Sequence, residues 1–457
     1  MAVSDNLMID TNSGFGDAVH PWPFARLHKT LNRLTALVHH CSRCQPSPNE
    51  RFAVAFRQRH GALRAYSKGS SPFFMRKVLG SLTAAVLVIL LVSYGLWTGK
   101  RHVGHYLTDL RIQLVINDGQ PGGHGNLLGI QPELFPSDYS SVKRLHRKLA
   151  SYMVQARDQG LLNDKTIVVL PEHIGTWLLA VDEKSQFYQA TTLDEAMNWL
   201  AFSNPLLFID AVVHARGRNR FEDARLRMKA RSMAQDYQNV FGGLAREFGV
   251  TVVAGSIVLP SPQVENGELR IGRGALYNSS LVFGPDGMPL GQPQRQLFPG
   301  WNQLGYIRPG KDAPLNVIDT PAGRLATLIG SDSWYPDNYA RLNASGAELI
   351  AVPAYVAGAG GWSQPWRSDK HKSLAARLNL GATPMTQGEA WRRLALTPAS
   401  TAKAGVSVFM RGQFWDQGSA GHSFASRGGQ SIAEQSINAT PKGTRPGQGA
   451  RLINLWL

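Results

Sequence analysis

One stretch of this sequence has the form that often carries a catalytic nucleophile. It reads LATLIGSDSWYPD (325–337), which predicts a strand, a tight turn and then a helix. The turn holds Gly330 and Ser331, neither of which is a cysteine. Only Cys41 and Cys44 occur in the chain, so the part beyond residue 100 has no thiol nucleophile and no internal disulfide. A serine hydroxyl attacks a carbonyl carbon only when a general base activates it, so catalysis by Ser331 requires such a base.

A candidate base follows another predicted strand. The run KTIVVLPE (165–172) is almost entirely apolar, which is typical of a buried strand, and it ends at Glu172. A carboxylate at this place can accept a proton from an attacking group. An isolated glutamate at a strand end is more often a solvated surface acid, so the residue alone leaves both interpretations open.

The surrounding pattern alternates strands with helices from about residue 110 onwards. Because several of the strands are joined by hairpins, the pattern favours an α/β domain with mixed sheets covered by helices. The predicted strands are 126–132, 165–172, 250–260, 347–354 and 405–411, the hairpins are 275–292 and 315–329, and the helices are 140–159, 221–249, 336–346 and about 386–403.

Four segments together are similar to a known family. They are VVLPEHIGTW, LYNSSLVFGPDGMPLGQ, RLATLIGSDSWYPDNYARLNASGAELIAVPA and AGVSVFMRG, in this order. Over residues 125–425 the chain resembles the nitrilase, or carbon–nitrogen hydrolase, superfamily. Relatives of apolipoprotein N-acyltransferase are members with a membrane anchor and an external domain. The resemblance implies an α-β-β-α sandwich for a domain at 103–457.

The resemblance also implies a catalytic set of a Glu base, a Lys that stabilises an oxyanion and a Cys nucleophile. Glu172 matches the base, but Gly330 stands at the cysteine position. In QPQRQLFPG, Gln294 stands at the lysine position and Gln296 where a His often occurs. Arg295 would replace the lysine only if the strand bulges, because a shift of one residue turns a side chain to the opposite face.

The expected pocket follows from the same alignment. Asp332 matches an acidic neighbour of the nucleophile, and we expect His173, Trp334 and Tyr335 to line the entrance. The insertion 173–220 holds long apolar runs, and it is either a lid or membrane-dipping segment or an ordinary packed helix with a loop. The C-terminal segment ARLINLWL could pack on its own domain or on a neighbouring subunit.

These residues lead to three hypotheses. The first is a protein that binds a small acyl or amide ligand, or a partner, without hydrolysing it. The second is an atypical amide hydrolase or N-acyltransferase that uses Ser331 or a water activated by Glu172. The third is an assembly protein that acts through a homodimer of the nitrilase type. None of them requires a cofactor or a metal ion.

A second apolar segment predicts a membrane anchor. Residues 78–97 carry no charge, and about 20 helical residues span the hydrocarbon core of a bilayer. Five Lys/Arg lie within the preceding twenty residues and three within the following twenty, which favours a cytoplasmic N-terminus and an external domain, periplasmic in a bacterium. Residues 1–74 read as a basic, disordered arm, and translation could start at Met1 or Met75.

Charge and cysteine spacing exclude two further functions. The formal net charge is +16, and residues 1–101 hold 13 Lys/Arg against 4 Asp/Glu, so the excess gathers near the N-terminus. The folded part shows no Lys/Arg cluster with interleaved aromatics, so we expect no nucleic-acid binding. His39, His40, Cys41 and Cys44 lack a second Cys/His pair, so no zinc site is expected.

Overall fold

A computed structural model describes residues 72–99, 108–300, 302–311, 313–366, 374, 384–396, 400–434 and 449–457. Nearly all of the expected N-terminal arm lies outside these residues, as do His39, His40, Cys41 and Cys44. Two units separate by their internal contacts, Met1–Leu79 and Gly80–Leu457.

The first sheet combines strands from both ends of the domain. Its strands pair in parallel and antiparallel fashion, as the predicted hairpins require. In spatial order it holds β1 (Ile112–Asp118), β19 (Ala450–Trp456), β2 (Asn126–Gln131), β4 (Thr166–Val169), β5 (Thr251–Val253), β9 (Leu276–Phe283) and β10 (Pro289–Arg295), with β6 (Ile257–Pro260) also paired to β9.

The second sheet is built from the chain beyond residue 316. Its first two strands form the predicted hairpin, and the parallel strands that follow are connected through helices. In spatial order it holds β11 (Val317–Thr320), β12 (Gly323–Thr327), β13 (Leu349–Ala354), β14 (Ala404–Phe409), β17 (Phe424–Arg427) and β18 (Gln430–Ile432). Two small sheets join β3 (Glu133–Leu134), β15 (Arg411–Phe414) and β16 (Gln417–Ala420), and β7 (Gln263–Glu265) with β8 (Glu268–Arg270).

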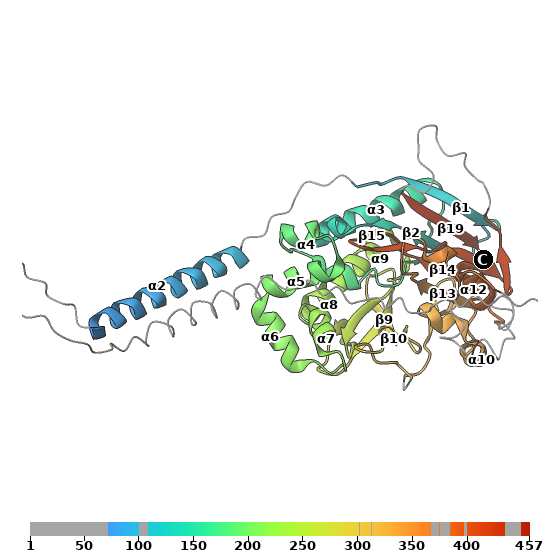
Figure 1. The fold of residues 1–457 in the computed structure, drawn as a ribbon. Helices are drawn as coiled ribbons and strands as arrows, with labels where there is room; N and C mark the ends of the chain where they lie inside the picture. The colour runs from blue at the N-terminus through green and yellow to red at the C-terminus, as the bar shows by residue number, and fades with distance from the viewer. Residues whose placement is uncertain are drawn as a thin grey trace, which may run out of the picture. The chain divides into compact units, whose positions relative to one another are not determined.

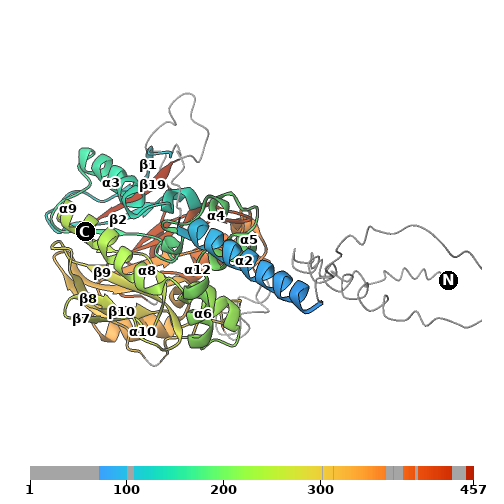
Figure 2. The same cartoon turned by 90° about the vertical axis from the view of Figure 1, so that its left-hand side faces the viewer.

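The two large sheets pack face to face and are covered by helices, which confirms the predicted α-β-β-α sandwich (Figures 1 and 2). Side chains of both sheets form one core cluster between them. Gly129 of β2 permits their close approach, because a Cβ there would lie 2.9 Å from Val408 of β14. The outer helices are α3 (Val142–Asp158), α8 (Ala230–Tyr237) and α9 (Gly243–Phe248) on the first sheet, and α10 (Pro336–Ala344) and α12 (Gln387–Leu394) on the second.

Local signals placed several helix ends correctly. Ser141 caps α3 by accepting a hydrogen bond from the Arg144 backbone N–H, near the expected start of the helix predicted over 140–159. The prediction of one helix over 221–249 was wrong, because the structure has α7 (Arg220–Arg227), α8, a π turn (Gln238–Gly242) and α9. The break before α8 falls at Lys229, whose ammonium group bonds the Glu183 carboxylate 2.8 Å away.

The predicted strand 250–260 is also interrupted. Gly255 adopts a φ of +65° between β5 and β6, and a Cβ at this place would lie 2.1 Å from the Pro171 carbonyl oxygen. The predicted helix at 386–403 is shorter than expected, since α12 ends at Leu394.

The insertion 173–220 is helical. It contains a 3-10 turn (Thr176–Ala180) and the helices α4 (Ser185–Gln189), α5 (Leu193–Ser203) and α6 (Pro205–His214). The C-terminal segment ARLINLWL forms β19 between β1 and β2, so it packs within its own domain.

The described helix before the domain is α2 (Pro72–Gly99). Its portion Arg76–Gly99 has 24 residues and is not buried, so by length and composition it could cross a membrane. A helix of this length extends about 36 Å, compared with about 30 Å for a hydrocarbon core.

Candidate active site

Three chain segments converge on Glu172, which lies just beyond β4 and is 5% exposed. The Asn278 side-chain amide of β9 donates to Glu172 Oε1 over 2.9 Å, and the Gln296 amide donates to the same oxygen over 3.2 Å. The Tyr355 backbone N–H donates to this carboxyl group as well. Glu172 is therefore held in one position at the place where the sequence predicts a general base.

Gly330 lies directly against this carboxyl group. It adopts a φ of +53°, a left-handed conformation that glycine tolerates and other residues rarely adopt. A Cβ at residue 330 would lie 2.7 Å from Glu172 Oε2 and 3.0 Å from Gln296 Nε2. The Glu172 carboxyl and the Gln296 amide thus occupy the space into which a side chain at residue 330 would extend.

Of the two glutamines in QPQRQLFPG, the one expected at the lysine position does not meet the Glu172 carboxyl group. Gln294 donates to the Arg295 carbonyl and accepts from the Asn316 N–H, so it does not contact Glu172. The Gln296 side chain does contact Glu172. The Gln296 backbone N–H donates to the Asn278 carbonyl, so the two residues lie side by side and both amides reach the carboxyl group. Of these two glutamines, only Gln296 forms a hydrogen bond to Glu172 in the part of the chain that the structure describes.

Arg295 does not replace the lysine. The strand does shift register between Leu290 and Gln294, as this replacement would require. The Arg295 guanidinium nevertheless lies over the Tyr277 ring, 4.3 Å from its centroid, and donates to the Pro262 carbonyl. The extended alternation of the strand directs this side chain away from Glu172.

Ser331 and Asp332 bind the loop that follows β10. The Ser331 hydroxyl donates to the Phe298 carbonyl oxygen over 2.6 Å, and no bond joins it to Glu172 in the described structure. The fully buried Asp332 carboxylate accepts the backbone N–H groups of Leu297 and Phe298 over 2.8–3.0 Å. Both side chains therefore fix the loop against the turn. Asp332 was expected in the pocket, but its carboxylate is buried against this loop.

Neither aromatic residue of the turn lines the cavity beside Glu172. Trp334 is buried in the core of the second sheet, where its ring packs 4.9 Å from that of Trp391. Tyr335 stacks on Phe298 with their centroids 3.8 Å apart. The expectation of an entrance lined by Trp334 and Tyr335 was wrong, because the helical turn directs them to the core and to the loop.

Burial controls the protonation of the site. Burial, followed by the nearby Asp332 charge, raises the pKa of Glu172 to about 8, against the effect of its hydrogen-bond donors. Burial likewise raises the pKa of Asp332 to about 7, and lowers the pKa of His173 to about 4. His173 lies 3.8 Å from Glu172 and is uncharged at neutral pH, so it does not favour the carboxylate. Burial therefore favours the protonated form of Glu172.

His173 connects this carboxyl group to a cavity of about 410 Å³. The Gln303 amide lies 3.2 Å from Nε2 of His173, and the ring meets that of Tyr355 edge-on. Helix α5 of the insertion and helix α7, which follows it, form part of the wall. The lining side chains come from widely separated parts of the chain and include Thr176, Trp177, Met197, Arg225, Tyr306, Tyr355 and Asp416.

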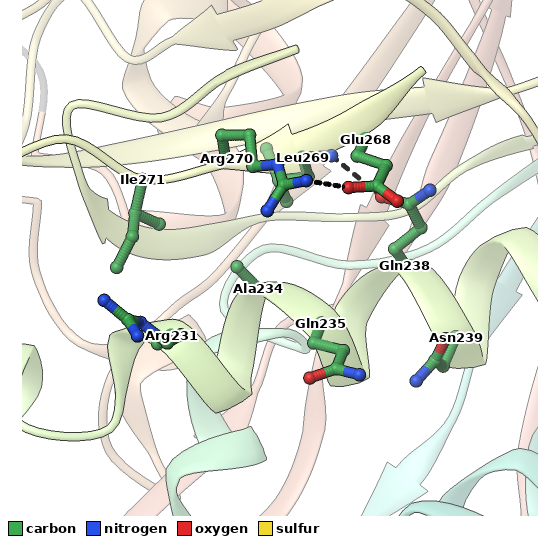
Figure 3. Close-up of a pocket in the computed structure, with 9 residues that line it drawn as sticks. All are labelled: Arg231, Ala234, Gln235, Gln238, Asn239, Glu268, Leu269, Arg270 and Ile271. Carbon is green, nitrogen blue, oxygen red and sulfur yellow. Dashed lines mark hydrogen bonds and ion pairs between the residues drawn. The ribbon is translucent and has the colours of Figure 1, made fainter. Parts of the chain in front are cut away.

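A larger cavity, of about 610 Å³, lies between α8 and β8 (Figure 3). Its side chains are mainly polar, and Arg270 forms an ion pair with Glu268. It shares no lining residue with the cavity that reaches His173. Within the described ranges, no three His, Cys, Asp or Glu side chains gather to hold a metal ion.

Sequence reasoning missed several residues around Glu172. Asn278 lies in the LYNSS segment that carried the family resemblance, so its position was recognisable although its contact was not. Tyr355 and Gln303 gave no signal, because they meet His173 only through the fold.

Comparisons with known proteins agree with this architecture. The carbon-nitrogen hydrolase family model matches residues 136–378, more than half of the chain. The chain therefore belongs to the carbon-nitrogen hydrolase family. This assignment covers the turn at Gly330 and the residues that surround Glu172.

Individual relatives are distant. Deaminated glutathione amidase of Yersinia enterocolitica is 28% identical over 156 residues, which cover 33% of this chain and 49% of the relative. N-carbamoylputrescine amidase of Arabidopsis thaliana is 28% identical over 85 residues, 18% of this chain and 28% of the relative. The chain thus spans about half the length of the first relative and less than a third of the second. Among solved structures, an amidase of Nesterenkonia sp. has a TM-score of 0.41 and 15% identity, covering 75% of this chain and 93% of that one.

Proposed function

We propose that this protein is a membrane-anchored member of the carbon-nitrogen hydrolase family that binds a small acyl or amide compound without hydrolysing it. The observation that carries the proposal is that Gly330 offers no side chain at the turn, and that the Glu172 carboxyl and the Gln296 amide fill the space where one would extend. Covalent catalysis requires an atom that attacks, and a glycine supplies none.

The protonation of Glu172 supports the same conclusion. A general base must be ionised at the working pH, whereas burial holds the Glu172 pKa at about 8. A lysine ammonium group beside it would favour the charged carboxylate, but the neutral Gln296 amide stands there. A neutral amide in place of a lysine therefore leaves Glu172 without the positive charge that would keep it ionised.

The choice of ligand class rests on two observations. The cavity beside His173 is large enough for a small molecule and combines aromatic with polar side chains. The similar curated proteins are amidases, which supports a compound with an amide or carboxylate group. The apolar helix α2 supports a single membrane anchor. The five Lys/Arg before residues 78–97, against three after them, support an N-terminus in the cytoplasm and a domain outside.

The experiment is intact-mass analysis of the full chain in detergent after incubation with an activated acyl ester. A Cys41→Ser/Cys44→Ser background removes the two native thiols. We expect no acyl adduct on this protein, and an adduct on its Gly330→Cys/Gln296→Lys variant. The Gly330→Ala/Gln296→Lys variant is the matched control, since it adds the Cβ without a nucleophile.

An adduct on the native residues that maps to Ser331 would overturn the proposal. So would turnover of a small amide that is lost in Glu172→Gln, because it would show that Glu172 activates water. Alkylation of Gly330→Cys by iodoacetamide checks that the new thiol is reachable, which separates a blocked site from one that cannot be acylated.

A further inference from the structure

Helix α6 presents an apolar face that the domain does not cover. Leu206, Ile209 and Val213 are 81%, 61% and 65% exposed, although they lie in a helix of which only Ala211 is buried. These three residues, named here the α6 face, follow one side of the helix at i, i+3 and i+7. Exposed aliphatic side chains clustered on one helix face indicate a surface that contacts an apolar phase or a partner.

The preceding helix meets α6 at a sharp angle. Helices α5 and α6 are bent by 104° at Asn204, and together they are apolar enough to resemble a broken membrane segment. Phe202, at the end of α5, is 46% exposed beside this bend. The apolar exposure therefore extends over the corner of the α5–α6 hairpin (Leu193–His214).

Basic residues adjoin the α6 face. Arg216, Arg218 and Arg220 are exposed in the segment that follows α6, and these three are named here the arginine cluster. The acid on α6, Asp210, lies 3.2 Å from the His214 ring on the flank of the helix. An apolar helix face next to arginines is typical of a helix that lies in the headgroup region of an anionic bilayer.

The chain length to α2 places a bilayer within reach. Only residues 100–107 separate the end of α2 from the described part of the domain, and a segment of that length extends at most about 30 Å. If α2 crosses a membrane, the domain must stay close to the bilayer surface. This proximity to the bilayer depends on the proposed anchor.

We propose that the α5–α6 hairpin docks into the interface of an anionic lipid bilayer. The α6 face enters among the upper acyl chains, and the arginine cluster contacts phosphate groups. Because α5 also lines the cavity beside His173, docking brings the wall of this cavity to the membrane surface.

The test uses single cysteines in the full chain with Cys41→Ser and Cys44→Ser, labelled with an environment-sensitive fluorophore. Leu206→Cys reports the α6 face, Val86→Cys reports α2, and exposed Ala344→Cys on α10 is the matched control in the other helical layer. The protein is reconstituted into phosphatidylglycerol vesicles that contain lipids with a quencher near the headgroup or deep in the acyl chain.

We expect the label at residue 206 to shift to the blue and to be quenched about twofold or more by the shallow quencher, as in interfacial helices. The label at residue 344 should show neither effect. Replacing the arginine cluster by glutamines should reduce quenching at residue 206, and so should phosphatidylcholine vesicles.

Equal quenching at residues 206 and 344 would overturn the inference. If the label at residue 86 is quenched deeply in that case, the anchor stands and only the hairpin docking fails. Quenching at 206 without quenching at 86 would mean that the hairpin docks and the anchor fails. A blue shift at 206 without lipid quenching would show that protein covers the α6 face, which also overturns the proposal.

Discussion

Replacing Glu172 by glutamine should change how the stability of the domain depends on pH. Burial and the Asp332 charge raise the Glu172 pKa to about 8 in the folded chain, from 4.5 as the ordinary value. Between these two values the unfolded chain releases a proton that the folded chain retains. The contribution of this group to the free energy of unfolding is therefore fully present below pH 4.5 and is lost as the pH rises through 8.

The magnitude follows from the size of the shift. Each unit of pKa difference corresponds to about 1.4 kcal/mol, so Glu172 reduces the free energy of unfolding by up to roughly 5 kcal/mol between pH 4.5 and 9. Glutamine has nearly the same size and carries no charge, and its carbonyl can still accept from Asn278. An unmet hydrogen bond of the new N–H₂ group can lower the free energy of unfolding of the variant by about 1 kcal/mol, but this loss is independent of pH.

The assay is chemical denaturation of both proteins in detergent from pH 5 to pH 9, followed by tryptophan fluorescence. The stability of Glu172→Gln relative to the native protein should increase by several kcal/mol over this range. Asp332 titrates in both proteins, so its own contribution largely cancels in the difference. The exposed Glu265→Gln change on β7 is the control and should give a constant difference. Parallel stability curves for Glu172→Gln and the native protein would refute the buried, neutral carboxyl group.

Three further changes test other contacts. Gln296→Lys should lower the pKa of Glu172, because the new ammonium group would replace an amide 3.2 Å from Oε1, and carbon NMR of the labelled carboxyl measures the shift. Ser331→Ala should cost only about 1 kcal/mol of stability for its lost hydrogen bond, and an acylation assay that changed with this substitution would contradict the structural role. Lys148→Met should cost about 3–5 kcal/mol in denaturation, since it leaves the Asp138 carboxylate buried without the ammonium group 2.8 Å away, and a neutral effect would contradict a stabilising role for this ion pair.

Several features could be predicted because their signals are local. The start of α3 depends on a capping side chain and on the spacing of apolar residues in the first turns, so the helix predicted over 140–159 begins within two residues of α3. The hairpins at 275–292 and 315–329 were predicted from Pro and Gly turn residues, which act within four positions. The prediction of one long helix over 221–249 failed at Lys229, where the helix breaks. Lys229 forms an ion pair with Glu183, 46 residues earlier in the chain, and a contact at that distance leaves no local signal.

The sequence by itself determined that this family member has Glu172 but no thiol at the turn, since both facts depend only on residue identity in recognisable segments. The tertiary structure decided which glutamine stands beside that carboxyl group. Gln296 and not Gln294 contacts Glu172, because the register of β10 against β9 aligns residue 296 with Asn278. It also placed the C-terminal strand β19 between β1 and β2, where segments more than 300 residues apart pair. Hydrogen bonds and burial between distant segments fix such placements, and no local pattern in the chain records them.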